Sequence, residues 1–257
     1  MVTHESPGRV DPNGLILRSE ELVGAQLANE LVEYFELARD LTALGSDLVE
    51  RIGQAPGEIR AIHVGAVILA RILTDLQACM HLVRHGYAGQ AITLVTTMVE
   101  LMHAGAYIGA NEQRADDWLN WSDPKNAYPG LGFAKTFSAV AKNLGVPDDR
   151  VRREYETVYQ EASMVKHGNP LSMSETNVLT TPGLILAMIG PVPSPEFLWL
   201  GHVAMQWATR YALLATVSFQ ASHVSGEDYQ PLLESSVRLS ARHAELSAKS
   251  ARLRPAP

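Results

Sequence analysis

Two long apolar segments, separated by one short break, dominate the sequence between Glu58 and Ala110. Apolar residues recur in the first segment at spacings of three and four, which is typical of one face of an α-helix. The break is Gly86-Tyr87-Ala88-Gly89, and Gly86 stands where a glycine commonly ends a helix. The second segment continues the same spacing as far as Ile108. Because a short connection makes two helices lie antiparallel, these segments predict a helical hairpin, and their wide apolar faces place it at the centre of the fold.

The rest of the chain is also predicted to be mainly helical. Further helices are expected at residues 19–53, 112–121, 133–144, 148–167, 195–223 and 229–253. Between residues 171 and 195, where Pro and Gly recur, the apolar run Leu184 to Ile189 fits either a short strand or a buried turn of helix. We therefore predict an all-α fold, a single-domain bundle of about seven or eight helices built on the long central hairpin. We expect a flexible N-terminal arm at 1–18, the helical domain at 19–253 and a Pro-rich tail at 254–257.

Composition narrows the classes of function. A net charge of −7 gives no support to binding of nucleic acid through charge alone. The single cysteine, Cys79, cannot form an internal disulfide, which fits a cytoplasmic setting. No uninterrupted apolar run of about 18 residues is present, so no membrane span is predicted. Charged residues make up only 19% of the chain, and several helices have apolar faces, so we predict a homodimer. A protein partner or a small molecule is a further candidate ligand.

Two short segments carry a resemblance to known proteins. The first is the apolar helix from Leu94 to Ile108, in which Glu100 precedes Tyr107. The second is Tyr159-Gln-Glu-Ala-Ser163-Met-Val-Lys-His167-Gly168-Asn169. Together they resemble the R-S-x-x-E-type helix and the Y-x-x-x-S-x-x-V-H-G segment of bacterial all-helical domains of unknown function. The second segment is also similar to the R-S-x-x-x-H motif of the HEPN superfamily, many of whose members are ribonucleases in toxin–antitoxin and phage-defence systems.

The resemblance covers about residues 60–170 and lacks the arginine of the motif. Ala162 stands where the HEPN nuclease motif has arginine, and Thr96 stands four residues before Glu100. An arginine there would bind a phosphate and stabilise its developing charge. The resemblance therefore implies a HEPN-like binding or regulatory module without typical ribonuclease activity, linked to defence or stress.

The candidate binding residues are His103, Tyr107, Ser163 and Asn169. The resemblance implies that His167 acts in binding or in acid–base chemistry.

The alternative is a helix-bundle enzyme whose pocket contains Glu100, His103 and His167, with Glu100 and His167 as its catalytic residues. Glu100 and His103 are three residues apart and share a helix face, a spacing found in carboxylate-bridged metal sites of helix bundles. A pair formed by Glu100 and His103 with each other, or a buried polar network that they cap, is the favoured interpretation. Because a second E-x-x-H pair is absent from the sequence, no cofactor is expected, with a divalent metal as the alternative. We expect the three side chains to converge on one site.

Other polar residues in apolar surroundings have simpler interpretations. His81 and His85 are four residues apart, which suits a metal, but two basic groups at a helix end are favoured. Arg71 and Asp75 have the same spacing and predict an ion pair across one helical turn. The four tryptophans are interpreted as packing residues, since no basic stripe accompanies them.

Overall fold

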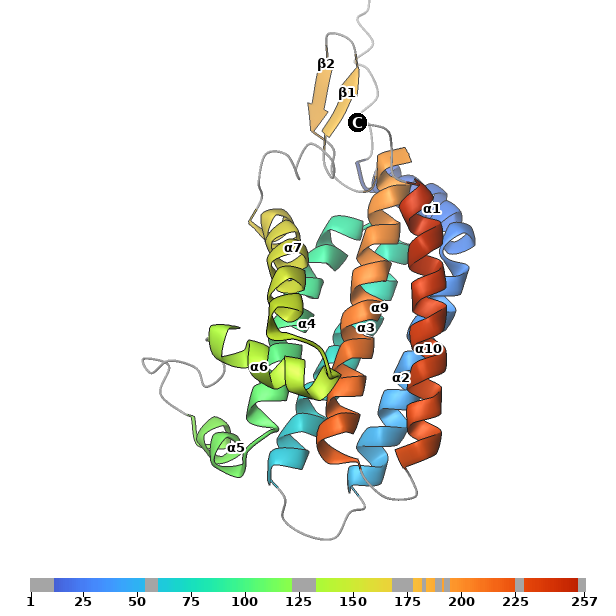
Figure 1. Ribbon diagram of the computed structural model, residues 1–257. Helices are drawn as coiled ribbons and strands as arrows, with labels where there is room; N and C mark the ends of the chain where they lie inside the picture. Colours follow the sequence, from blue (N-terminus) through green and yellow to red (C-terminus); the bar gives the residue numbers. More distant parts are fainter. Residues whose placement is uncertain are drawn as a thin grey trace, which may run out of the picture.

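The computed structural model describes residues 12–53, 60–121, 133–167, 178–181, 184–187, 191, 195–224 and 229–253 (Figure 1). The helices are α1 (Pro12–Glu30), α2 (Val32–Gly53), α3 (Arg60–Arg84), α4 (Ala88–Ile108), α5 (Glu112–Leu119), α6 (Phe133–Leu144), α7 (Asp148–Lys166), α9 (Pro195–His223), α10 (Tyr229–Ser250) and the short 3-10 helix η1 (Ala251–Leu253). The all-α prediction is confirmed. The described ranges contain nine α-helices, however, rather than seven or eight.

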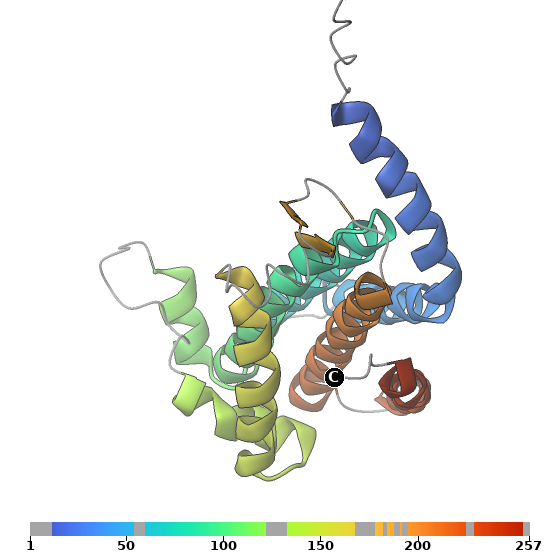
Figure 2. The same ribbon diagram turned by 90° about the horizontal axis from the view of Figure 1, so that it is seen from above.

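The additional helix arises because the expected helix at 19–53 is two helices. It begins at Pro12, so residues 12–18 are helical and do not belong to an extended arm. It then changes direction at Leu31, and Figure 2 shows α1 projecting away from the bundle. No proline or glycine marks this point, and the backbone hydrogen bonds from Leu31 N to Leu27 O (2.9 Å) and from Phe35 N to Leu31 O (3.0 Å) are kept. All three side chains are buried, so tertiary packing rather than a helix breaker sets the bend. Residues 1–11 and 254–257 lie outside the described part.

The apolar run at 184–189 contains a strand. Strand β2 (Leu184–Ala187) pairs antiparallel with β1 (Val178–Thr181), with Val178 opposite Ala187 and Thr181 opposite Leu184. This small hairpin lies at one end of the bundle (Figure 1). Residues 188 and 189 are not among those described.

The connection between α3 and α4 consists of three residues and depends on Gly86. Gly86 N–H donates to Val83 O (2.9 Å), and Tyr87 N–H donates to Leu82 O (2.8 Å). This is the Schellman arrangement, which requires a left-handed residue, and Gly86 has φ of 86°. A Cβ at Gly86 would also lie 2.4 Å from Cβ of Pro191. Any other residue at this position would therefore be strained in its backbone and would collide with its neighbour.

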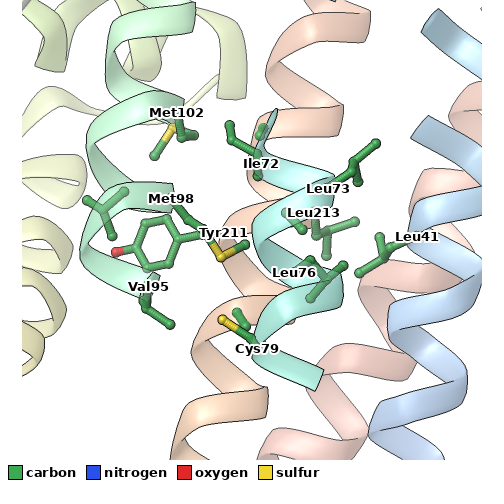
Figure 3. Close-up of a cluster of buried hydrophobic side chains, with 14 of the residues drawn as sticks. Leu41, Ile72, Leu73, Leu76, Cys79, Val95, Met98, Met102, Tyr211 and Leu213 are labelled. Atoms are coloured by element: carbon green, nitrogen blue, oxygen red, sulfur yellow. The ribbon is translucent and has the colours of Figure 1, made fainter. Parts of the chain in front are cut away.

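The core lies where α3, α4 and α9 meet. Helix α9 also contacts α2, α6 and α10, so it is shared by both sides of the bundle. Figure 3 shows Leu76 and Cys79 of α3, Met98 of α4 and Tyr211 of α9 packed together in this region. Helices α3 and α4 are long and apolar enough to cross a membrane, but 56% and 61% of their most apolar windows are buried inside the protein, as in core helices. This is weak evidence for a membrane span.

Candidate functional site

Glu100 lies on the face of α4 that packs against α7. Its Oε1 accepts a hydrogen bond from the Tyr159 hydroxyl (2.7 Å), and Nζ of Lys166 lies 4.0 Å away. About 30% of the Glu100 side chain is exposed, so the carboxylate is partly in contact with solvent. It is thus held by residues of α7 rather than by a second metal-binding residue.

His103 lies one turn further along α4 and is almost completely buried. Its Nδ1 is 2.9 Å from Oγ1 of Thr136, and its ring meets the rings of Phe137 and Tyr155 edge-on, with centroids 5.6 Å apart. Burial lowers the pKa of His103 to about 4. The imidazole is therefore neutral near pH 7.

Two tyrosines of α7 lie between Glu100 and His103. The rings of Tyr155 and Tyr159 are stacked with centroids 4.7 Å apart; Tyr155 contacts His103, and Tyr159 donates to Glu100. Burial, and secondarily the charge of Glu100, raises the pKa of Tyr155 to about 12. Glu100 and His103 are thus connected through the two tyrosines in a partly buried network, which fits the non-metal interpretation of their spacing. Within the described residues, no group of three His, Cys, Asp or Glu side chains is arranged to hold a metal ion.

His167 is exposed at the end of α7. Its backbone N–H donates to Ser163 O (3.0 Å). Its side chain has no recorded interaction with Glu100 or His103 in the part of the chain that is described. The structure therefore places Glu100 and His103 in one network and leaves His167 outside it.

Of the remaining expected binding residues, Tyr107 and Ser163 lie on α4 and α7. The Tyr107 ring lies under the guanidinium of Arg114, whose central carbon is 3.8 Å from the ring centroid, and Arg114 also donates to the Tyr107 carbonyl. Ser163 is half-buried on α7. Asn169 lies outside the described residues.

The structure also describes the Arg71–Asp75 pair and the His81–His85 pair. The ion pair between Arg71 and Asp75 is confirmed, with Nε 3.0 Å from Oδ1. Nδ1 of His85 faces the His81 carbonyl at 2.8 Å, so this ring nitrogen contacts the helix end rather than sharing a metal with His81.

A cavity of about 210 Å³ lies beside this network, between α4, α6, α7, α9 and α10. Of Glu100, His103 and His167, only His103 borders it. Most of its wall is apolar, formed by side chains that include Met102, Val140, Leu144, Val151, Leu214 and Val217.

An ion pair forms one polar part of the cavity wall. The guanidinium of Arg210, on α9, binds Glu154, on α7, with two hydrogen bonds, of which Nη2 to Oε2 measures 2.7 Å. The hydrogen bonds to Glu154 raise the pKa of Arg210. A two-bond pair of this kind fixes both side chains and joins α7 to α9 along the cavity.

The Tyr211 hydroxyl is the second polar feature. Tyr211 is only 1% exposed, it lines the cavity, and its hydroxyl has no hydrogen-bond partner among the residues described. In Figure 3 the hydroxyl end of the ring points away from Leu76 and Cys79 of the core. Burial raises the pKa of Tyr211, so the hydroxyl keeps its proton and is a donor. A buried donor without an acceptor is unfavourable by about 1–3 kcal/mol, so its presence requires an explanation.

Sequence reasoning missed this cavity. Helix α9 was predicted from its apolar residues, and Arg210 and Tyr211 were not singled out. The sequence did contain one signal for Arg210. The 29 residues of α9 include only two charged residues of the types Asp, Glu, Lys and Arg, and these are Glu196 and Arg210. A charged residue in the middle of an apolar helix needs a partner, and here that partner is Glu154.

Comparison of the chain with protein-family models, with curated proteins and with solved structures found no match. The function must therefore be argued from the residues of this chain.

Proposed function

We propose that this protein is a HEPN-like binding or regulatory module without typical ribonuclease activity. The observation that carries the proposal is the burial of the two positions at which the related motifs have arginine. Ala162 and Thr96 are both 0% exposed.

Burial at these positions is a stronger argument than the residue types alone. Ala162 lies on α7, which packs against α4 and α6, and the Thr96 hydroxyl donates to the Thr93 carbonyl (2.7 Å) within α4. A guanidinium enclosed at either position would lose its hydration and would not face a phosphate in solvent. The net charge of −7 also provides no long-range attraction for RNA.

A pocket that combines Glu100, His103 and His167 has less support. His103 is neutral and faces Thr136, Glu100 is held by Tyr159, and His167 is exposed outside their network. Binding is therefore favoured over catalysis, and the cavity lined by Tyr211 supports a small-molecule ligand.

We further propose that α3 and α4 form the central antiparallel hairpin, since three residues connect them and both pack against α9. Homodimer formation is proposed from the exposed Leu17 and Leu22 of α1, which are 60% and 63% exposed. A cytoplasmic location and a role in defence or stress complete the proposal. Light scattering that shows a monomer at working concentration would remove the dimer.

The test of the main proposal is an assay for RNA cleavage. The purified protein is incubated with structured and single-stranded RNAs beside the variant His167→Ala, and we expect neither to cleave above background. Loss of one charge-stabilising group commonly lowers a rate on the order of a hundredfold or more. Robust cleavage by the wild type that is lost in His167→Ala would overturn the proposal.

A further inference from the structure

We propose that the cavity between α4, α6, α7, α9 and α10 binds a small organic acid, with an apolar body about the size of one ring and a single carboxylate. The proposal rests on the binding role proposed above and names the class of ligand.

The size of the cavity sets the size of the ligand. A protein cavity of about 150 Å³ accommodates benzene, which has six non-hydrogen atoms. On that scale, the cavity of about 210 Å³ accommodates roughly eight or nine non-hydrogen atoms. This matches one ring with a short substituent and is too small to enclose a whole nucleotide or peptide.

The walls set the chemistry of the ligand body. Val140 and Val151 are almost completely buried, and Met102, Leu144, Leu214 and Val217 complete an apolar surface around the space. Binding sites for small molecules are commonly apolar with a few polar groups that fix orientation. Here the polar residues of the lining include Tyr211 and the pair formed by Arg210 and Glu154.

The Tyr211 hydroxyl requires an acceptor. It is buried at the cavity and unpaired among the described residues, whereas the other buried side-chain polar atoms in that part of the chain have partners. A carboxylate oxygen accepts a hydrogen bond from a phenol, and a bond to a charged group contributes about 1.5–3 kcal/mol.

The charges at the cavity favour an acid over an amine. Glu154 is already matched by Arg210, His103 is neutral, and Arg150 adds a positive charge at the exposed part of the lining. The lining therefore carries one positive charge in excess. Arg210, whose guanidinium has more donors than the two that bind Glu154, and Tyr211 both line this cavity, so its net charge favours a carboxylate over an ammonium group.

Benzoate is the probe, and benzyl alcohol and benzylamine are its neutral and cationic counterparts. Binding to the full chain is followed by calorimetry and by NMR of the methionine methyl groups, including Met102 in the cavity wall. We expect saturable binding of benzoate in the millimolar range or tighter, weaker binding of benzyl alcohol and no binding of benzylamine.

Three variants test whether benzoate binds in this cavity. Tyr211→Phe removes only the hydroxyl and should weaken benzoate about tenfold. Val217→Phe fills the cavity and should abolish binding. The matched control is Tyr34→Phe, which removes the hydroxyl of another buried tyrosine that bonds to Ser250 and does not line the cavity; its affinity for benzoate should equal that of the wild type.

Absence of saturable benzoate binding would overturn the proposal, and so would equal affinity in Tyr211→Phe and the wild type. Preference for benzylamine would do the same. Tyr211→Phe keeps the test decisive if Val217→Phe does not fold. RNA cleavage is measured on the same preparations. If the protein cleaves RNA and also binds benzoate, only the proposed function is rejected. If it shows no cleavage and no benzoate binding, only the proposed ligand is rejected.

Discussion

Tyr34 and Tyr211 are equally buried, at 2% and 1% exposed, but their hydroxyls lie in different environments. Tyr34, on α2, has its hydroxyl 3.0 Å from Oγ of Ser250, and Nδ1 of His202 is 3.1 Å from the same oxygen. Tyr211, on α9, lines the cavity and its hydroxyl is unpaired among the described residues. We call the region where α2 packs on α3, α9 and α10 the α2 side, and the region around the cavity the cavity side.

Within one bundle, the polar groups of one side are paired with each other, whereas a polar group of the other side is left unmatched among the described residues. On the α2 side, Tyr34 of α2, His202 of α9 and Ser250 of α10 meet each other, so the Tyr34 hydroxyl has a partner within the protein. On the cavity side, the pair of Glu154 and Arg210 connects α7 and α9 while the Tyr211 hydroxyl remains unmatched. That hydroxyl has no acceptor among the described residues, and such departures from full satisfaction of polar groups are expected at functional sites.

The largest expected contrast between the two sides is in packing. Leu41→Ala, on α2, removes a side chain that is 0% exposed and should destabilise the protein by about 3–4 kcal/mol. Leu214→Ala, in the wall of the cavity, should cost only about 1–2 kcal/mol because the leucine is half-buried and already borders a space. Urea unfolding followed by circular dichroism measures both values. Equal losses would show that the two sides are packed alike.

A second contrast concerns pH. The folded-state pKa of His103 is lowered to about 4 from 6.5, so below pH 6.5 the unfolded state takes up a proton first. Stability contributed by neutral His103 is therefore present above pH 6.5 and lost as the pH falls toward 4, by about 3 kcal/mol. The loss should be smaller in His103→Gln. His202→Gln, on the α2 side, should change the pH dependence less, because Glu30 opposes the effect of burial on the pKa of His202. An unchanged pH profile in His103→Gln would contradict this assignment.

The smallest expected effect is that of removing a tyrosine hydroxyl, which should change the free energy of unfolding in opposite directions on the two sides. Tyr34→Phe removes a buried hydrogen bond and should lower the free energy of unfolding by about 1 kcal/mol. Tyr211→Phe removes a buried donor that has no partner among the described residues, and should leave the free energy of unfolding of the ligand-free protein unchanged or raise it by up to about 1 kcal/mol. Chemical unfolding of both variants in the same buffer checks the signs. A clear destabilisation by Tyr211→Phe would mean that its hydroxyl is well satisfied without a ligand.

Helix positions were predictable from local patterns. Residues 133–144 and 195–223 were predicted as helices and correspond to α6 and α9 with the same bounds. Gly145, with φ of 64°, ends α6, and Pro195 begins α9, so glycine and proline marked these boundaries. The turn at Leu31 was missed because its cause is packing between distant residues.

The candidate site was less predictable. The bond between Tyr159 and Glu100 joins residues 59 apart, and the pair of Arg210 and Glu154 joins residues 56 apart. Neither spacing follows from a helical period, because both depend on which helices pack together. The short motif also directed attention to His167, which is exposed, rather than to Tyr211, which looks like an ordinary core residue in the sequence.

The burial of Ala162 also limits the mutational paths open to this protein. Replacing it with arginine in one step would force a guanidinium into a position with no exposed surface. That penalty is several kcal/mol, a large share of the roughly 5–15 kcal/mol by which native proteins are stable. A lineage that carries this packing between α4 and α7 would have to pass through poorly folded intermediates to acquire an arginine here. A single substitution at this position is therefore not expected to install the arginine of a nuclease motif.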